Sequence, residues 1–393
     1  MNTEVRTFTI DVSDEFLDDL RARLRNTRWP EKEPVEDWSQ GTPLSYVQEL
    51  CAYWADTYDW RASEAALNRF DHFTTVLGEE DGVDGLDIHF VHQRSPHDDA
   101  TPLILSHGWP GSIVEFHKVI EPLTDPTAFG GDAADAFHVV APSLPGYGFS
   151  GKPAQTGWGL ERIGGAFAEL MARLGYDRYV AQGGDWGAGI THAIGSLDPD
   201  HCAAIHMTLA MGARPSDLDD PSPAELHALE RADYYREWDS GYSKQQSTRP
   251  QSVGYGLVDS PSAQAAWILE KFWAWTDNAG EDGTDASRHP ENVLSRDELL
   301  DNIMLYWING NGASSARLYW ESFAKRPPLK MGDLPVGFAS FPREVVPPVR
   351  AWVEPMYPGL CHWAEYDKGG HFAAFEVPGV YVDEVRAFFR TFR

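Results

Sequence analysis

From about residue 100 onward, short apolar runs bounded by glycine and proline alternate with stretches of helical pattern. The apolar runs are PLILSHG at 102–108, FHVVAPS at 137–143, RYVAQGGD at 178–185 and AAIHMTLA at 203–210. Such an alternation is typical of β-α-β units, in which a parallel sheet is buried on both faces. We therefore expect an α/β fold with a mostly parallel sheet flanked by helices.

The first 95 residues are predicted to form an accessory region that precedes this sheet. Residues 13–29 place apolar side chains at helical spacing, and a second region of helical character extends over roughly residues 43–77. The run LDIHFVHQRS at 86–95 alternates apolar and polar side chains, which predicts a strand.

A helical lid is predicted to interrupt the main domain. The strand pattern disappears after Met211, where proline-rich joints separate helical segments, and it resumes with LPVGFASFP at 334–342. We assign residues 212–325 to the lid, and residues 96–211 together with 326–393 to the core that contains the sheet.

The composition argues against several classes of protein. The 60 acidic and 32 basic residues give a formal charge of −28, which opposes binding to nucleic acid or to anionic membranes. No stretch reaches the roughly 18 apolar residues of a membrane span, and no signal peptide is recognisable. Cys51, Cys202 and Cys361 form no CxxC pair, so neither a disulfide framework nor a zinc site is indicated. We expect a soluble cytoplasmic protein that uses no metal ion or other cofactor.

The run Gly183-Gly184-Asp185-Trp186-Gly187 lies between an apolar run and a helical stretch. It has the glycine-x-nucleophile-x-glycine form of a sharp strand-to-helix turn that projects its central side chain. A carboxylate in this position can displace at an sp³ carbon without prior deprotonation, and it leaves an alkyl ester behind. Asp185 is therefore the candidate nucleophile. On this run alone, an aspartate that caps the following helix is an equal alternative.

The run His107-Gly108-Trp109-Pro110 follows an early predicted strand. Enzymes with such a nucleophile turn supply one oxyanion-hole amide from a loop in this place. The backbone N–H groups of Trp109 and Trp186 are the candidates for binding the oxyanion that forms when water attacks the ester. The alternative is a tight turn without a chemical role.

A histidine late in the chain completes the predicted set. His371, in Gly369-Gly370-His371-Phe372, follows the nucleophile in the order nucleophile, acid, histidine, and is the candidate general base. The acid that orients it is predicted to be Glu344, just after the run VGFAS, with Asp367 or Asp333 as alternatives.

With HGWP, GGDWG, FPRE and GGHFAAFE in this order, the chain resembles the microsomal-type epoxide hydrolases of the α/β-hydrolase superfamily. The resemblance covers nearly the whole chain, and it implies an α/β-hydrolase fold with a helical lid and an epoxide-hydrolase N-terminal region. Vertebrate members begin with a membrane anchor, for which this sequence shows no candidate, so we expect no membrane attachment.

The resemblance also implies the reaction. An epoxide and water would give a vicinal diol through an alkyl ester on Asp185, which water activated by His371 and Glu344 would hydrolyse. Two lid tyrosines would hold the epoxide oxygen: Tyr242, in Ser240-Gly241-Tyr242, and Tyr319, in Ala316-Arg317-Leu318-Tyr319, are assigned by local motif. The expected partner is a small-molecule epoxide, in detoxification or secondary metabolism, and a homodimer is one option for the assembly.

Two other functions fit part of the pattern. Haloalkane dehalogenases share GGDWG, with an aspartate nucleophile, a histidine and an acid, but their lid should lack the tyrosine pair. A ligand-binding protein on the same fold should lack the histidine or the acid. A serine esterase is excluded because residue 185 is not a hydroxyl.

Overall fold

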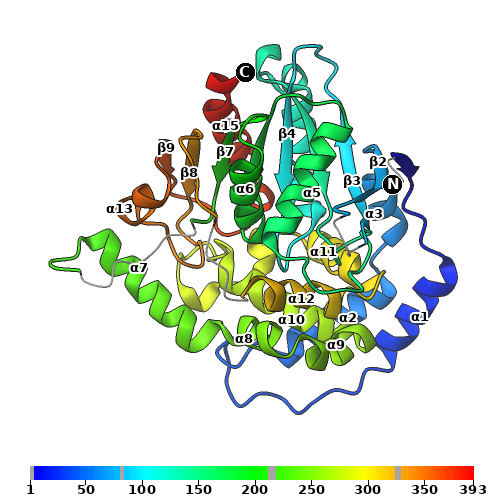
Figure 1. Ribbon diagram of the computed structural model, residues 1–393. Helices are drawn as coiled ribbons and strands as arrows, with labels where there is room; N and C mark the ends of the chain where they lie inside the picture. The colour runs from blue at the N-terminus through cyan, green and yellow to red at the C-terminus, as the bar shows by residue number, and fades with distance from the viewer. Residues whose placement is uncertain (1–3, 80–83, 211–217, 324–328) are drawn as a thin grey trace.

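The computed structural model describes residues 4–79, 84–210, 218–323 and 329–393 (Figure 1). Within these residues, nine strands form one sheet in the order β1-β2-β3-β5-β4-β6-β7-β8-β9. Neighbours from β5 through to β9 are parallel, whereas β1, β2, β3 and β5 pair antiparallel in turn. The predicted, mostly parallel sheet is therefore confirmed. The strands are β1 (Arg6–Phe8), β2 (His72–Leu77), β3 (Leu86–Gln93), β4 (Thr101–Ser106), β5 (Phe137–Pro142), β6 (Tyr179–Gly183), β7 (Cys202–Met207), β8 (Val336–Ser340) and β9 (Leu360–Glu365).

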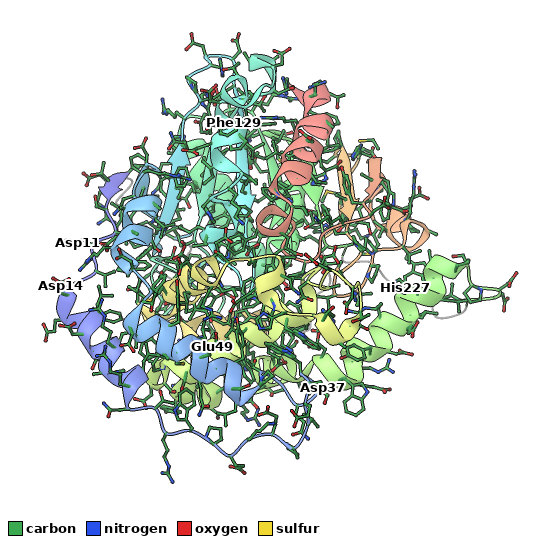
Figure 2. All side chains as sticks on the ribbon, turned by 180° about the vertical axis from the view of Figure 1, so that it is seen from behind. Asp11, Asp14, Asp37, Glu49, Phe129 and His227 are labelled. Atoms are coloured by element: carbon green, nitrogen blue, oxygen red, sulfur yellow. The ribbon has the colours of Figure 1, made fainter. Side chains whose placement is uncertain are left out.

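Helices cover both faces of the sheet. In Figure 1, α5 (Leu160–Arg173) and α6 (Trp186–Leu197) lie on the face toward the viewer. The C-terminal helix α15 (Pro378–Phe389) lies on the other face, and it is in front when the molecule is seen from behind in Figure 2. Short helices accompany these layers: η1 (Ile113–Phe116), α4 (Ile120–Thr124), α13 (Arg350–Val353) and α14 (Ala373–Glu376). The central strands are consequently buried on both sides, as their continuous apolar runs indicate.

The N-terminal region contributes to the sheet itself. Helix α1 (Asp14–Arg25) begins where Ser13 Oγ accepts a hydrogen bond from the backbone N–H of Phe16. The predicted helical region 43–77 contains α2 (Leu44–Asp56) and α3 (Trp60–Leu67), but its last part is strand β2. Extension of the helical prediction to residue 77 was wrong, because HFTTVL pairs along its whole length with β3. Its β-branched residues fit a pleated strand better than a helix.

The lid helices are grouped at one end of the sheet, next to the N-terminal helices α1 and α2 (Figure 1). The described lid elements are α7 (Pro223–Tyr234), the π-helical turn η4 (Tyr235–Asp239), α8 (Gly241–Thr248), α9 (Pro250–Asp259), α10 (Pro261–Trp275), the short turns η5 (Asp285–Ser287) and η6 (Pro290–Asn292), α11 (Arg296–Trp307) and α12 (Gly312–Ser322). Helix α10 contacts both α1 and α2, so the lid and the N-terminal region support each other. The predicted lid boundaries, after residues 211 and 325, lie outside the described residues, and the division into domains stays a prediction.

In the described parts of the chain, no helix is long and apolar enough to cross a membrane.

Candidate active site

Asp185 occupies a strained turn between strand β6 and helix α6. Its backbone has a φ of 48°, a left-handed value that is uncommon for a residue other than glycine. Two glycines allow the close packing around it. A Cβ on Gly187 would lie 1.9 Å from the carbonyl oxygen of Ser106, and a Cβ on Gly108 would lie 2.1 Å from Oδ1 of Asp185. The turn therefore projects the Asp185 carboxylate beyond the carboxyl end of the sheet, as a nucleophile turn does.

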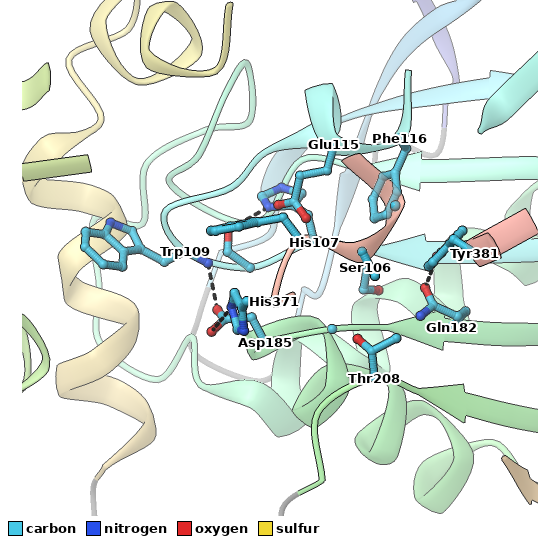
Figure 3. A pocket seen from close by; sticks show the side chains of 15 residues that line it. Ser106, His107, Trp109, Glu115, Phe116, Gln182, Asp185, Thr208, His371 and Tyr381 are labelled. Atoms are coloured by element: carbon cyan, nitrogen blue, oxygen red, sulfur yellow. Dashed lines mark hydrogen bonds and ion pairs between the residues drawn. The ribbon is translucent and has the colours of Figure 1, made fainter. Parts of the chain in front are cut away.

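The Asp185 carboxylate has one partner at each oxygen (Figure 3). The backbone N–H of Trp109 donates to Oδ1 at 2.7 Å. Nε2 of His371 lies 3.2 Å from Oδ2, although its N–H is not aligned for a hydrogen bond. Of the two predicted oxyanion-hole amides, only that of Trp109 donates to Asp185 in the described part of the chain; the Trp186 amide begins helix α6.

His371 is held by a buried carboxylate on its other ring nitrogen. Nδ1 lies 2.6 Å from Oε1 of Glu344, whose side chain is 1% exposed. The backbone N–H of His371 donates to the carbonyl oxygen of Trp275 in the lid, at 2.9 Å. The alternative acids, Asp367 and Asp333, are exposed. The structure thus brings Glu344, rather than either alternative, to His371.

The two carboxylates set the charge of His371. Burial alone would lower the pKa of the imidazole, but the carboxylates of Glu344 and Asp185 outweigh it and hold the pKa well above 6.5. The two carboxylates therefore favour the protonated, imidazolium form of His371.

The two lid tyrosines lie against the tryptophans that flank the nucleophile. Tyr242 stacks on Trp109 with ring centroids 4.7 Å apart, and Tyr319 meets the ring of Trp186 edge-on at 4.7 Å. The Tyr242 and Tyr319 rings are themselves 5.7 Å apart, and both side chains are buried. Burial, reinforced by the charge of Asp185, raises the pKa of both phenols well above 10. Both phenols therefore keep an O–H group that can donate a hydrogen bond beside the nucleophile.

Across the described ranges, no group of three or more histidine, cysteine, aspartate or glutamate side chains is arranged to hold a metal ion. The arrangement instead combines a carboxylate nucleophile, a histidine–carboxylate pair and two phenol donors, the groups needed to alkylate an enzyme and then hydrolyse the ester.

Known proteins similar to this chain place it in a family. Residues 5–116 match the family described as epoxide hydrolase N terminus, and residues 101–249 match the alpha/beta hydrolase fold. A putative epoxide hydrolase of Stigmatella aurantiaca is 53% identical over 391 residues, which cover 99% of this chain and 86% of that protein. The chain belongs to the epoxide hydrolase family. Epoxide hydrolase 1 of Sus scrofa is 37% identical over 411 residues, covering 98% of this chain and 88% of its own length.

Solved structures of two epoxide hydrolases superpose on this chain. Juvenile hormone epoxide hydrolase of the silkworm Bombyx mori matches with a TM-score of 0.87 and 30% identity, covering 100% of this chain and 95% of that one. The Aspergillus niger epoxide hydrolase matches with a TM-score of 0.85 and 32% identity, covering 99% and 97%. These matches confirm the α/β-hydrolase fold and the resemblance inferred from the four motifs.

The sequence did not single out two side chains near the site of this epoxide hydrolase. The hydroxyl of Tyr235, in the π-helical turn η4, lies 3.2 Å from that of Tyr242. Glu115, on the short helix η1, lines the same cavity as Asp185 and His371. The spacing of 15 tyrosines could not select Tyr235, and a single glutamate eight positions after His107 carries no recognisable pattern.

Proposed function

We propose that this epoxide hydrolase converts an epoxide and water to a vicinal diol in two steps, through an alkyl ester on Asp185. The arrangement that carries the proposal is the Asp185 carboxylate between Trp109 and His371, beneath the buried Tyr242–Tyr319 pair. The first step needs a nucleophile and donors for the leaving oxygen, and the second needs a base for water.

In the first step, one oxygen of Asp185 attacks a ring carbon of the epoxide, and the bond from that carbon to the ring oxygen breaks. The oxygen leaves as an alkoxide, which is a poor leaving group without a hydrogen-bond donor. Tyr242 and Tyr319 donate to it as its charge grows, which stabilises the transition state more than the bound epoxide. The imidazolium of His371 is the acid whose proton the alkoxide finally takes.

Ester formation changes His371 from an acid into a base. The ester removes the negative charge of Asp185, which is one of the two charges that raise the pKa of His371. The neutral ring, still held by Glu344, can then accept a proton from water while the oxygen of that water attacks the carboxyl carbon of Asp185. The oxyanion that forms is bound by the N–H groups of Trp109 and Trp186. Collapse of this intermediate breaks the ester bond, the leaving diol oxygen takes the second proton of the water, and the His371 imidazolium is regenerated.

The haloalkane dehalogenase alternative is not pursued, because the relatives that match the whole chain are epoxide hydrolases. The position of the phenols also fits the epoxide reaction better, since an alkoxide needs O–H donors.

A covalent adduct is the decisive test. His371→Gln should still be alkylated, because Tyr242 and Tyr319 remain to donate to the leaving oxygen, but its ester should be hydrolysed slowly. Mass spectrometry after mixing with styrene oxide should therefore find one substrate mass on the peptide that contains Asp185. Asp185→Asn is the matched control and should gain no mass. An unmodified His371→Gln protein, with wild-type enzyme making diol, would replace covalent catalysis with direct attack by water.

We propose further that the enzyme acts in the cytoplasm on a bulky or aryl-substituted epoxide, in detoxification or secondary metabolism, and that it forms a homodimer. Its three cysteines are free, as in a reducing compartment. The lid exposes the aromatic side chains of Trp238, Tyr255 and Phe323, which an interface would cover. Comparing the rates on aryl and aliphatic epoxides tests the substrate class, and the molar mass in solution tests the homodimer.

A further inference from the structure

A small cavity with both polar and apolar walls lies on the sheet side of Asp185. Its walls come from the ends of β4, β6 and β7, from helix η1, from α15 and from the loop of His371, and none of the described lid residues lines it. It leaves about 20 Å³ for the centres of water molecules. That is room for one or two waters, because a single buried water needs roughly 10–15 Å³ by the same measure.

Polar atoms without a partner point to water in this cavity. Among the buried side-chain atoms of the described residues, Oγ of Ser106 and Nε2 of His371 have no hydrogen-bond partner, and both residues line the cavity. Leaving such atoms unpaired costs about 1–3 kcal/mol each, and a water with two to four polar neighbours removes that cost.

Glu115 supplies a further polar group of the cavity wall, as Figure 3 shows. Its Oε1 lies so close to Gly111 that a Cβ there would approach within 1.4 Å, so the glycine makes room for the carboxyl group. Burial raises the pKa of Glu115 to about 8, against the lowering effect of His371 and with a further raising effect of Asp185. A backbone hydrogen bond from Ser112 lowers the pKa slightly in turn. The group is consequently mostly an uncharged carboxylic acid at pH 7, whose carbonyl oxygen can accept a further hydrogen bond from water.

We propose that Glu115 holds the water that hydrolyses the ester, by accepting one of its hydrogens while His371 takes the other. The inference rests on the proposed two-step function and assigns this chain a further catalytic residue for the second step.

The position of the cavity suits this attack. The alkyl group of the ester lies on the lid side with Tyr242 and Tyr319, so a water on the sheet side reaches the carboxyl carbon without meeting the diol. One O–H bond of the water breaks as its proton moves to Nε2 of His371, and the new carbon–oxygen bond forms to Asp185. The hydrogen that Glu115 holds stays on the attacking oxygen until the leaving diol oxygen takes it, so Glu115 itself gains and loses no proton.

Separate rates for the two steps test the proposal. In Glu115→Leu, which removes the acceptor, single-turnover ester hydrolysis should slow about ten- to hundredfold, as expected when an attacking group is misplaced. Ester formation should stay within about twofold of wild type, so the alkylated enzyme should accumulate. Glu115→Gln has nearly the same shape and keeps an acceptor oxygen, so it should retain most of the hydrolysis rate. It also tests the proposal if the leucine variant does not fold.

Gly111→Ala provides an independent route to the same defect. Its Cβ should displace the Glu115 carboxyl group and slow hydrolysis, and the effects of Gly111→Ala and Glu115→Leu should not add when combined, because both act on one interaction. Gly379→Ala is the matched control, since a Cβ there meets nothing within 4 Å. Glu121→Gln, a half-exposed glutamate on α4, controls for the lost carboxylate.

Wild-type ester hydrolysis in folded Glu115→Leu would overturn the proposal, as would an equal slowing of both steps. These outcomes differ from a failure of the two-step function, in which His371→Gln would form no adduct at all.

Discussion

Glu344 decides the tautomer and the charge of His371, because it binds Nδ1 of the ring at 2.6 Å. Glu344→Gln should lower the pKa of His371 and leave the imidazolium of the second step without its counter-charge. We expect ester hydrolysis to fall by about 10²-fold or more, and ester formation to fall less. Rapid-mixing measurements of both steps check this, with Asp367→Asn as the control. If both rates were unchanged in Glu344→Gln, another acid would have to orient His371.

The lid phenols should act on the first step alone. Tyr242→Phe and Tyr319→Phe each remove one hydrogen bond to a developing alkoxide, and a hydrogen bond to a charged group is worth about 1.5–3 kcal/mol. Each variant should therefore form the ester roughly 10- to 100-fold more slowly, and the double variant should be almost inactive. Tyr255→Phe is the control, since Tyr255 is 71% exposed. A double variant that opened epoxides normally would remove both residues from the mechanism.

Residues of the site differed in how far the sequence could identify them. Asp185 and His371 stand in short motifs whose glycines are required by the turn, so their places follow from local sequence. Glu344 needed the order of the chain, and Asp367 and Asp333 stayed alternatives at the level of sequence; in the structure the carboxylate 2.6 Å from the His371 ring is that of Glu344. Glu115 could not be found, because only folding brings η1 to the ends of β6 and β7.

At the scale of elements, the π-helical turn η4 connects the start of α8, which carries Tyr242, to helix α10. Asp239 at its end binds Nζ of Lys271 at 2.6 Å and the indole N–H of Trp275 at 2.6 Å. Nζ of Lys271, whose side chain is 2% exposed, lies 4.8 Å from the ring centroid of Tyr242. The turn therefore joins α8 to α10 through one largely covered carboxylate, whose side chain is 11% exposed.

Asp239→Asn should loosen this junction. We expect the free energy of unfolding to fall by about 2–3 kcal/mol, at the low end of the cost of breaking a buried pair, because Glu270 still pairs with Lys271 at 2.5 Å. Ester formation should slow as Tyr242 loses its fixed position. Asp233→Asn, in an exposed pair with Arg236, should cost less than about 1 kcal/mol. Urea titrations compare the two, and equal losses would contradict a special role for the turn.

Strand β2 marks the limit of predicting elements from local pattern. The strand is short and follows α3 closely, so the helical spacing of the preceding residues was wrongly continued through it. Pairing with β3 along six positions, Leu77 opposite Leu86 among them, decides the strand, and that partner is not visible locally. The central strands were predictable because burial on both faces leaves a continuous apolar run.

For the whole molecule, buried histidines should set the acid limit of stability. Burial, helped by the nearby positive charges of Arg94 and His138, lowers the pKa of His92 to about 4, and burial likewise lowers that of His107 to about 4. A histidine with a lowered folded pKa contributes stability above its unfolded pKa of about 6.5. That contribution disappears as the pH falls toward 4.

The stability should therefore fall steeply between about pH 6.5 and pH 4. Each such histidine can account for about 3 kcal/mol of the loss, since one pKa unit corresponds to about 1.4 kcal/mol. His92→Gln removes one titrating ring outside the active site, together with its 2.8 Å contact to the Tyr176 hydroxyl. The variant should be less stable than wild type at pH 7, and the difference should shrink as the pH falls to 4.5.

His227→Gln, a change at an exposed position of α7, is the control and should follow the wild-type curve. Melting temperatures across this range test the sign, and a difference that widened in acid would show that His92 is charged in the folded protein.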